Sequence, residues 1–152
     1  MTNSERLAQL DIALPTVAAP VAAYVPAIRT GNQVWTSGQL PFVAGVLPAT
    51  GKVGAEVTAE QAQDYARIAV LNALAAVDAL VGIDQVTRVL KIVGFVSSAE
   101  GFTGQPGVVN GASNLVGEIF GEAGSHARSA VGVAELPLGS PVEVELIVEI
   151  AD

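Results

Sequence analysis

The stretch Pro141-Val142-Glu143-Val144-Glu145-Leu146-Ile147-Val148-Glu149-Ile150 alternates apolar and acidic side chains along much of its length. Successive side chains of a β-strand point to opposite faces of the sheet. The stretch therefore predicts a strand with one apolar face toward the core and one face that carries the carboxylates of Glu143, Glu145 and Glu149. Taken alone, such a carboxylate face is an ordinary solvated surface.

The residues just before this strand predict another strand and a helix. Residues 127–136 form the predicted strand, and turn residues at 137–141 separate it from the last one. Residues 106–120 form the predicted helix, in which Pro106 occupies the first turn and which Gly121 ends.

A strand and the longest helix are predicted in the middle of the chain. Residues 87–97 have a continuously apolar centre, which is typical of an interior strand covered on both faces. A capping box at 58–61 opens a helix that small apolar residues continue at three- and four-residue steps up to Gly82. Asn72 interrupts its apolar face, and we expect this amide to satisfy neighbouring backbone groups.

The N-terminal half predicts a β-hairpin followed by an irregular loop. Residues 24–29 and 33–39 flank a Gly-Asn pair, which is a hairpin signal. Glycines and prolines in residues 40–57 prevent a long regular element there, although a short irregular hairpin fits within 42–47.

A short helix is predicted at the start of the chain, with Ser4 as its N-cap and Leu10 as its end. The prolines that follow predict an extended connector. Residues 1–23 are therefore interpreted as an N-terminal helix and connector, and residues 24–152 as a single domain. The order of the elements predicts an α+β fold with helices on one face of a sheet.

Composition excludes several classes of function. The net charge of −8 repels a phosphate backbone, so nucleic acid is not an expected partner. The chain has no cysteine and a single histidine, so we expect neither a thiolate metal site nor a cofactor. No basic leader or long apolar run is present, which indicates a cytoplasmic protein without a membrane partner. The charged fraction of 14% is low for the surface of a monomer and favours an oligomer.

Arg128 and Glu143 are the candidate functional pair. Both lie at the start of predicted strands that follow one another, so they could form a structural ion pair across neighbouring strands. Alternatively, Arg128 presents its planar fork of donors to a ligand carboxylate while Glu143 orients the fork or a water molecule. His126 has no second histidine or cysteine to join it in a metal site, and we expect it to have a structural role or to lie at the rim of the site.

Three motifs carry a resemblance to a known family. Thr36-Ser37-Gly38-Gln39-Leu40-Pro41 is similar to a TSGQ(I/L)P motif, and Ala127-Arg128-Ser129, followed by Val131, Val133, Leu136 and Pro137, is similar to ARSxVxVxxLP. Val142-Glu143-Val144-Glu145 resembles a closing VEIE strand. Over about residues 24–150 the chain resembles the RidA/YjgF family of reactive intermediate deaminases, also labelled endoribonuclease L-PSP, and looks like a longer, divergent subgroup of it.

The resemblance implies a chorismate-mutase-like fold, in which a mixed β-sheet carries two helices on one face. It also implies a homotrimer with pockets between subunits. In such a pocket the arginine holds a substrate carboxylate, and a water molecule positioned by the glutamate attacks an imine carbon. Carried onto this chain, Arg128 and Glu143 would be catalytic, and the substrate-binding residues would be Tyr24, Ser37, Gly38, Asn110 and Ala130.

The chain also departs from the family pattern. Ala130 stands where the best-known members have cysteine, His126 stands where proline is common, and the loop at 42–57 is longer. Three functions are weighed: hydrolytic deamination of 2-imino or enamine acids, non-catalytic binding of a small carboxylate metabolite such as a 2-keto acid by the trimer, and endoribonuclease or translation-inhibitor activity, which the negative charge opposes.

Overall fold

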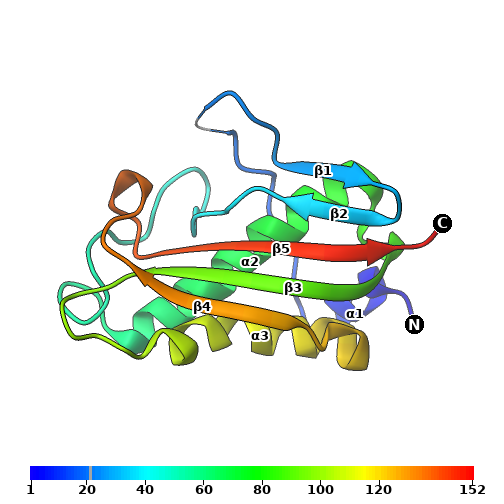
Figure 1. The fold of residues 1–152 in the computed structure, drawn as a ribbon. Helices are drawn as coiled ribbons and strands as arrows, with labels where there is room; N and C mark the ends of the chain where they lie inside the picture. The colour runs from blue at the N-terminus through cyan, green and yellow to red at the C-terminus, as the bar shows by residue number, and fades with distance from the viewer. Residues whose placement is uncertain (21) are drawn as a thin grey trace.

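The computed structural model describes residues 1–20 and 22–152 and shows an α+β fold built on one mixed sheet (Figure 1). The five strands lie in the order β1-β2-β5-β3-β4. β3 and β4 run parallel, and the other neighbouring pairs are antiparallel. The bounds of the strands are Ala27–Thr30 (β1), Gln33–Thr36 (β2), Val86–Ser97 (β3), Ala127–Val133 (β4) and Val142–Ile150 (β5).

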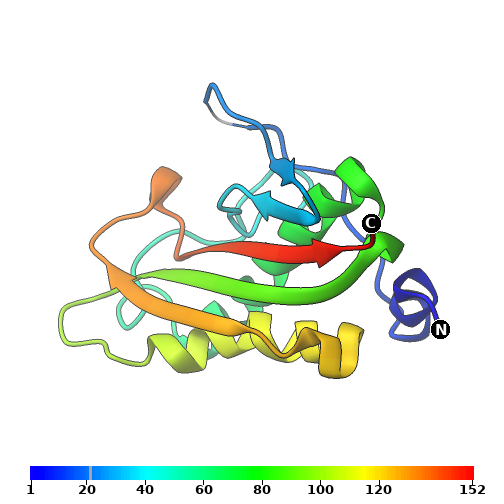
Figure 2. The same ribbon diagram turned by 45° about the vertical axis from the view of Figure 1, so that its right-hand side comes forward.

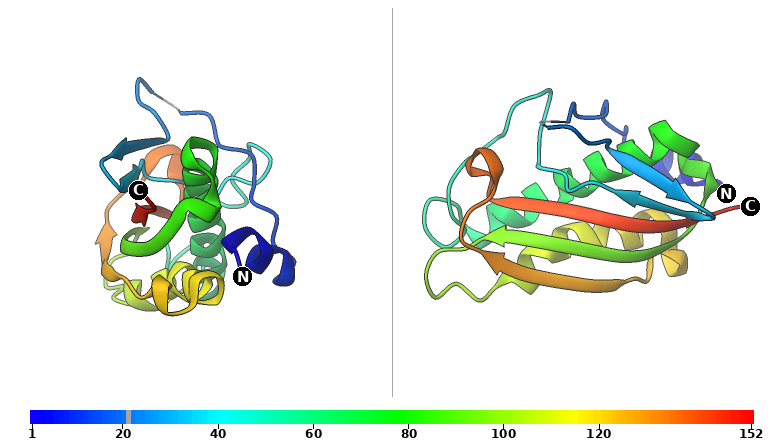
Figure 3. Two further views of the ribbon diagram at one scale, coloured as in Figure 1. Left: turned by 90° about the vertical axis from the view of Figure 1, so that its right-hand side faces the viewer. Right: turned by 45° about the horizontal axis from the view of Figure 1, so that its top comes forward.

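Two long helices cover one face of this sheet, as the sequence predicts (Figure 3). They are α2 (Ala59–Val81) and α3 (Gln105–Phe120). The capping box that opens α2 is present, since Thr58 and Gln61 each bind the backbone nitrogen of the other. Val144, Leu146 and Val148 of β5 are buried beneath the helices, so the apolar face of the closing strand forms the centre of the core. None of the described helices is both long and apolar enough to cross a membrane.

Close packing of α3 fixes its orientation. A Cβ atom on Gly111 would lie 2.8 Å from the carbonyl carbon of Gln63 in α2, so only glycine permits this approach. On the other side, Gly94 of β3 accommodates Val109 at similarly short range. Two sides of α3 thus contact α2 and the sheet. The polar side chains of Asn110 and Ser113 point from α3 toward β4.

A third helix, α1 (Asn3–Gln9), adds to the two predicted on the sheet and lies beside the turn that leads into β3 (Figure 2). The residue that caps it is Thr2, not the predicted Ser4, because Thr2 and Glu5 form a capping box. Ser4 instead binds the carboxylate of Asp84 through its backbone nitrogen and its hydroxyl group, both at 2.7 Å. The predicted connector continues from α1, and its residue Val21 lies outside the described residues.

Several element ends differ from those predicted. β1 begins at Ala27, so Tyr24 precedes the strand instead of opening it. β2 ends at Thr36, and Gln39 forms an isolated bridge to Val144 of β5. β4 ends at Val133, before the single 3₁₀ turn η3 (Pro137–Gly139). The predicted irregular hairpin in the long loop is confirmed by a bridge between Val43 and Val46. Nearby prolines and glycines limit the lengths of these strands, because proline has no backbone N–H group to donate and glycine weakens a strand.

The coverage of β3 differs from the prediction, which expected both faces of this strand to be covered. The strand is interior, with β5 and β4 as neighbours, but helices of the chain cover only one of its faces. The other face, which we call the open face, carries half-exposed apolar side chains. Trp35 is 47% exposed and Ile28 is 61% exposed, and these two lie in register with each other and next to Ile147. The apolar centre of β3 is therefore covered on one face and partly exposed on the other in the single chain.

Candidate functional site

Arg128 lies in β4, the edge strand, in register with Ile92 of β3. Ile92 is fully buried under the helices, and side chains in register point to the same face. Arg128 accordingly points toward α3, where its Nη1 donates to Oδ1 of Asn110 at 2.7 Å and to Oγ of Ser113 at 3.2 Å. Its Nε and Nη2 donate to no residue in the described part of the chain, so these donors are available for a ligand.

His126 extends this contact into a chain of hydrogen bonds. Its Nδ1 lies 2.6 Å from the carbonyl oxygen of Gly124, and its Nε2 lies 2.9 Å from Oγ of Ser113. A carbonyl oxygen only accepts, so Nδ1 carries a proton and donates to Gly124. The hydroxyl group of Ser113 accepts from Arg128 and forms a second hydrogen bond with Nε2 of His126. We call Asn110, Ser113, His126 and Arg128 the arginine group.

Ser113 belongs to this group although the sequence reasoning missed it. The signal that could have found it is its spacing, because Ser113 follows Asn110 by three positions and therefore lies on the same face of a helix. Ala130 lies two residues after Arg128 on the same face of β4 and packs against the core. The predicted residues Asn110, Arg128 and Ala130 are thus brought together, and His126 has the structural role that its isolation in the sequence suggested.

Glu143 points to the other face of the sheet. Its neighbours Val142 and Val144 are buried in the core, whereas Glu143 is half-buried on the open face, in register with Phe95. Its carboxylate forms neither a hydrogen bond nor an ion pair with the residues that the structure describes. Burial raises the pKa of Glu143 above that of an ordinary glutamate, and the nearby charge of Glu145 raises it further.

Gly38 lies directly against Glu143. The bridge between Gln39 and Val144 lays the segment after β2 over the start of β5. A Cβ atom on Gly38 would lie 2.8 Å from Cδ of Glu143 and even closer to one of its carboxylate oxygens. Any side chain at position 38 would force the Glu143 carboxylate to move from its present position.

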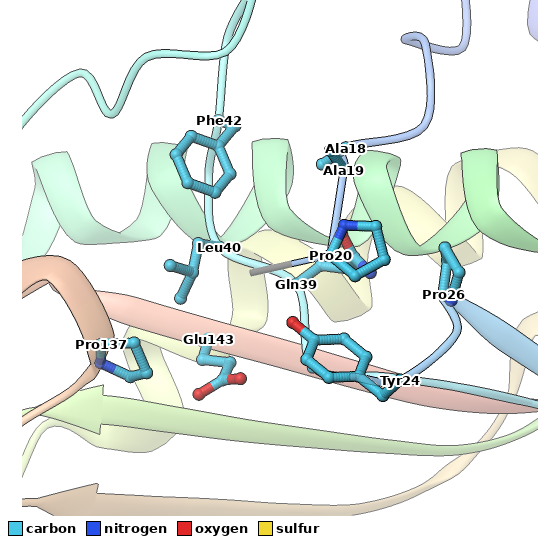
Figure 4. A pocket seen from close by; sticks show the side chains of 11 residues that line it. Ala18, Ala19, Pro20, Tyr24, Pro26, Gln39, Leu40, Phe42, Pro137 and Glu143 are labelled. Atoms are coloured by element: carbon cyan, nitrogen blue, oxygen red, sulfur yellow. The ribbon is translucent and has the colours of Figure 1, made fainter. Parts of the chain in front are cut away.

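A hollow with about 430 Å³ of empty space surrounds this carboxylate. Figure 4 shows Tyr24, Leu40 and Pro137 around Glu143. We call it the glutamate hollow, and its lining residues are Ala18, Ala19, Pro20, Tyr24, Pro26, Gly38, Gln39, Leu40, Phe42, Pro137 and Glu143. Ser37 is not one of them, because its hydroxyl group donates to the carbonyl oxygen of Val25 at 2.6 Å and holds the segment after Tyr24 in place.

The structural ion pair considered for Arg128 and Glu143 is wrong for the folded chain. β4 pairs with β3 and not with β5, because the α3 crossover returns the chain parallel to β3 at the edge of the sheet. β5 then pairs with the other side of β3. The two candidate catalytic residues therefore lie on opposite faces, separated by β3.

The chain therefore carries two separate groups of chemical interest on opposite faces of the sheet. The arginine group offers a fixed cation with unused donors, which suits a carboxylate. The glutamate hollow offers an acid-base group with a raised pKa beside an apolar wall, which suits proton transfer to or from a bound water molecule. No set of three or more His, Asp or Glu side chains that could hold a metal ion occurs among the described residues.

Known proteins resemble this chain along most of its length. Residues 4–150 match the protein family described as "YjgF/chorismate mutase-like, putative endoribonuclease". Protein TCP17 of Trypanosoma cruzi is 45% identical over 148 residues, which are 95% of this chain and 91% of that protein. The 2-iminobutanoate/2-iminopropanoate deaminase of Escherichia coli (strain K12) is 34% identical over 90% of this chain and 94% of its own. The crystal structure of Atu1372 from Agrobacterium tumefaciens, a protein of unknown function, matches with a TM-score of 0.90 and 42% identity over 98% of this chain and 92% of that one.

Proposed function

The chain belongs to the YjgF/chorismate mutase-like family, and from that premise we propose that it hydrolyses 2-imino acids and their enamine tautomers to 2-keto acids and ammonia. Relatives at 32% and 34% identity are named 2-iminobutanoate/2-iminopropanoate deaminases. The observation that carries the proposal is the geometry of Arg128. Among the residues that the structure describes, only its Nη1 is held by hydrogen bonds, and its remaining donors would form an anchor for the carboxylate that every such substrate has.

The chemistry requires a water molecule and one acid-base group. Arg128 binds the substrate carboxylate, and Glu143 accepts a proton from water as the water oxygen bonds to the imine carbon. Glu143 returns this proton to the nitrogen, which gives a neutral carbinolamine. Glu143 then takes the proton of the carbinolamine hydroxyl group and passes it to the nitrogen, so that the C–N bond breaks and ammonia leaves as the C=O bond of the keto acid forms. Burial raises the pKa of Glu143, which makes its carboxylate a stronger proton acceptor than that of an ordinary glutamate.

We further propose that the complete pocket lies between two copies of the chain in a homotrimer. One copy would supply Arg128 and Asn110, and its neighbour would supply Glu143, Gly38 and Tyr24. The opposite orientations of Arg128 and Glu143 support this division, because a ligand between them cannot pass through the sheet of a single chain.

The open face of the sheet supports the same assembly. Its half-exposed apolar side chains, among them Ile28, Trp35 and Val131, form a surface that a second copy would bury. Closed symmetric assembly is the usual way in which identical chains cover such a face.

A complementation experiment tests the activity and the division of the pocket together. Arg128→Ala and Glu143→Gln are each expected to lower the rate of ammonia release from freshly generated iminopropanoate to the uncatalysed level. Unfolding and refolding an equal mixture of the two variants would form mixed trimers. Random mixing gives each pocket both intact residues in about a quarter of cases, so about a quarter of the activity should return.

Two results would contradict the proposal in different ways. If either variant, folded and purified alone, retains the wild-type rate, the residue is not catalytic. If both variants are inactive and the refolded mixture stays inactive while refolded wild type recovers, the pocket is not shared between copies. An inactive wild type that binds 2-keto acids would instead identify a carboxylate-binding protein.

A further inference from the structure

A second and larger hollow adjoins the glutamate hollow. Its empty space of about 1380 Å³ includes a part that is open to solvent. We call it the connector hollow, and it is lined by residues Pro15, Thr16, Val17, Ala18, Ala19, Phe42, Ala44, Gly45, Asn72 and Leu138. Ala18, Ala19 and Phe42 line both hollows, so the two meet at these side chains. Figure 4 shows the three at one end of the glutamate hollow, with Leu40 between Phe42 and Glu143.

The walls of the connector hollow are apolar and uncharged. The connector after α1 contributes Pro15, Val17 and two alanines, and the long loop after β2 contributes Phe42. No Asp, Glu, Lys or Arg is among the residues that line it. A charged group would lose its hydration there without gaining a partner, whereas an apolar group would gain from leaving water.

Asn72 supplies one polar point in this wall. Its side chain is only 2% exposed, and its Nδ2 donates to the carbonyl oxygens of Leu40 and Phe42 at 3.0 and 3.1 Å. These bonds confirm the expected structural role of the amide, since they tie the long loop to α2. Oδ1 of Asn72, by contrast, accepts no hydrogen bond from any part of the chain that the structure describes. A buried amide usually has partners for both of its ends, so the free oxygen suits a donor on a bound molecule.

We infer that the connector hollow binds the side chain of the substrate and selects 2-imino acids with a long, uncharged, aromatic or branched side chain. The inference rests on the proposed function, because it places the carboxylate and imine groups near Glu143. The side chain then passes Phe42 and enters the connector hollow, and a donor at its far end binds Oδ1 of Asn72. The N-terminal connector and the longer loop, both departures from the compact family pattern, thereby become determinants of specificity.

The test compares small and large product analogues in binding and in turnover. Calorimetry would give dissociation constants of wild-type protein for pyruvate, phenylpyruvate and 4-hydroxyphenylpyruvate. Burial of the phenyl ring should make phenylpyruvate bind at least about tenfold more tightly than pyruvate. The hydroxyl donor should tighten binding by a further factor of about three to ten. Ammonia release from the imines derived from alanine and phenylalanine should show the same order in kcat/KM.

A matched pair of variants locates the effect. Thr16 is exposed and lines only the connector hollow, so Thr16→Trp fills that hollow without disturbing the core. Ala13 is an exposed residue of the same connector and lines neither hollow, so Ala13→Trp is the control. Thr16→Trp should reduce the affinity for phenylpyruvate to that for pyruvate and leave pyruvate binding unchanged. Ala13→Trp should change neither.

The outcomes separate this inference from the proposed function. Equal affinity of wild type for pyruvate and phenylpyruvate, or equal losses for both in Thr16→Trp, would overturn the assignment of the connector hollow even if imines are hydrolysed. Equal affinity for the two aromatic acids would overturn the role of Asn72. A wild type that prefers phenylpyruvate, and loses this preference in Thr16→Trp, would support the binding site even if it hydrolyses no imine and the proposed function fails.

Discussion

Arg128 and Glu143 lie on opposite faces of one sheet, two strands apart. Arg128 is in register with Ile92, whose antiparallel partner in β5 is Leu146, three residues beyond Glu143. The two residues are therefore offset along the strands as well as across the sheet. Within one chain the sheet separates the two side chains, which is the arrangement that the proposed pocket between two copies would resolve.

Replacing Arg128 with lysine should lower kcat/KM for iminopropanoate about 100-fold, because a point charge cannot reproduce the planar fork that binds a carboxylate through two bonds. Steady-state ammonia release measures the change, and an unaltered melting temperature would show that the fold is intact. Arg88→Lys is the control, since Arg88 is exposed at the other end of β3. A wild-type kcat/KM in Arg128→Lys would mean that charge alone is sufficient.

Ser113→Ala should weaken binding of 2-keto acids about three- to tenfold, because it removes one hydrogen bond that orients Arg128 and breaks the chain to His126. Calorimetric titration with pyruvate measures the affinity. Ser125→Ala changes an exposed serine close to His126 in sequence and should leave binding unchanged. Equal binding by both variants would show that Asn110 alone orients the guanidinium group.

Gly38→Ala should lower kcat/KM at least about 100-fold, because the new methyl group would occupy the space of the Glu143 carboxylate and displace it. Gly117→Ala is the matched control. Gly117 is exposed in α3 and has open space where a Cβ atom would lie, so this change should raise the free energy of unfolding by about 0.5–1 kcal/mol without altering activity. Full activity of Gly38→Ala would show that the position of the carboxylate is not critical.

The pH dependence of kcat/KM should have an acid limb that reports Glu143. Below its pKa the carboxyl group is protonated and cannot accept a proton from water, so activity rises as pH increases through that pKa. Because burial and Glu145 raise the pKa, the limb should lie above the value of about 4.3 for an unperturbed glutamate. Glu145→Gln removes the neighbouring negative charge. Glu143 then ionises more easily, so its pKa falls and the acid limb should move to lower pH. A limb that stays in place would show that another group controls it.

Trp35→Glu should dissociate the assembly and abolish activity, since it places a charge among the half-exposed apolar side chains of the open face. Analytical ultracentrifugation should show a mass near 15.4 kDa for this variant and a trimer for wild type. Val46→Glu is the control, because Val46 is exposed in the long loop and not in a strand of the sheet. An active monomer would rule out the shared pocket.

The sequence predicted the elements of this fold well where local chemistry determines them. The alternation in residues 142–150, the capping box at Thr58 and the glycine at position 82 each define a boundary that the structure confirms. The cap of α1 was misplaced, because Thr2 and Ser4 both suit an N-cap and the contact of Ser4 with Asp84 is long-range. Single-sequence patterns contain no information on such a partner.

The candidate site was predicted less completely, because its geometry depends on strand order. Adjacent strands in the sequence suggested that Arg128 and Glu143 were neighbours, whereas the crossover through α3 places β4 on the far side of β3. Ser113 was missed because a serine in a helix carries no signal of its own. The family motifs found both halves of the site, but only the fold shows that they face opposite ways.

The attachment of α1 has a consequence for the order of folding. Asn3 donates to the carbonyl oxygens of Ile83 and Val86, and the first of these partners lies 80 residues further along the chain. At a synthesis rate of about 5–20 residues per second, Asn3 is made roughly 4 to 16 seconds before this partner. The first helix of the chain therefore cannot dock until the middle of the chain has been synthesised. Because the connector is held between α1 and β1, the connector hollow takes its final shape only after this docking.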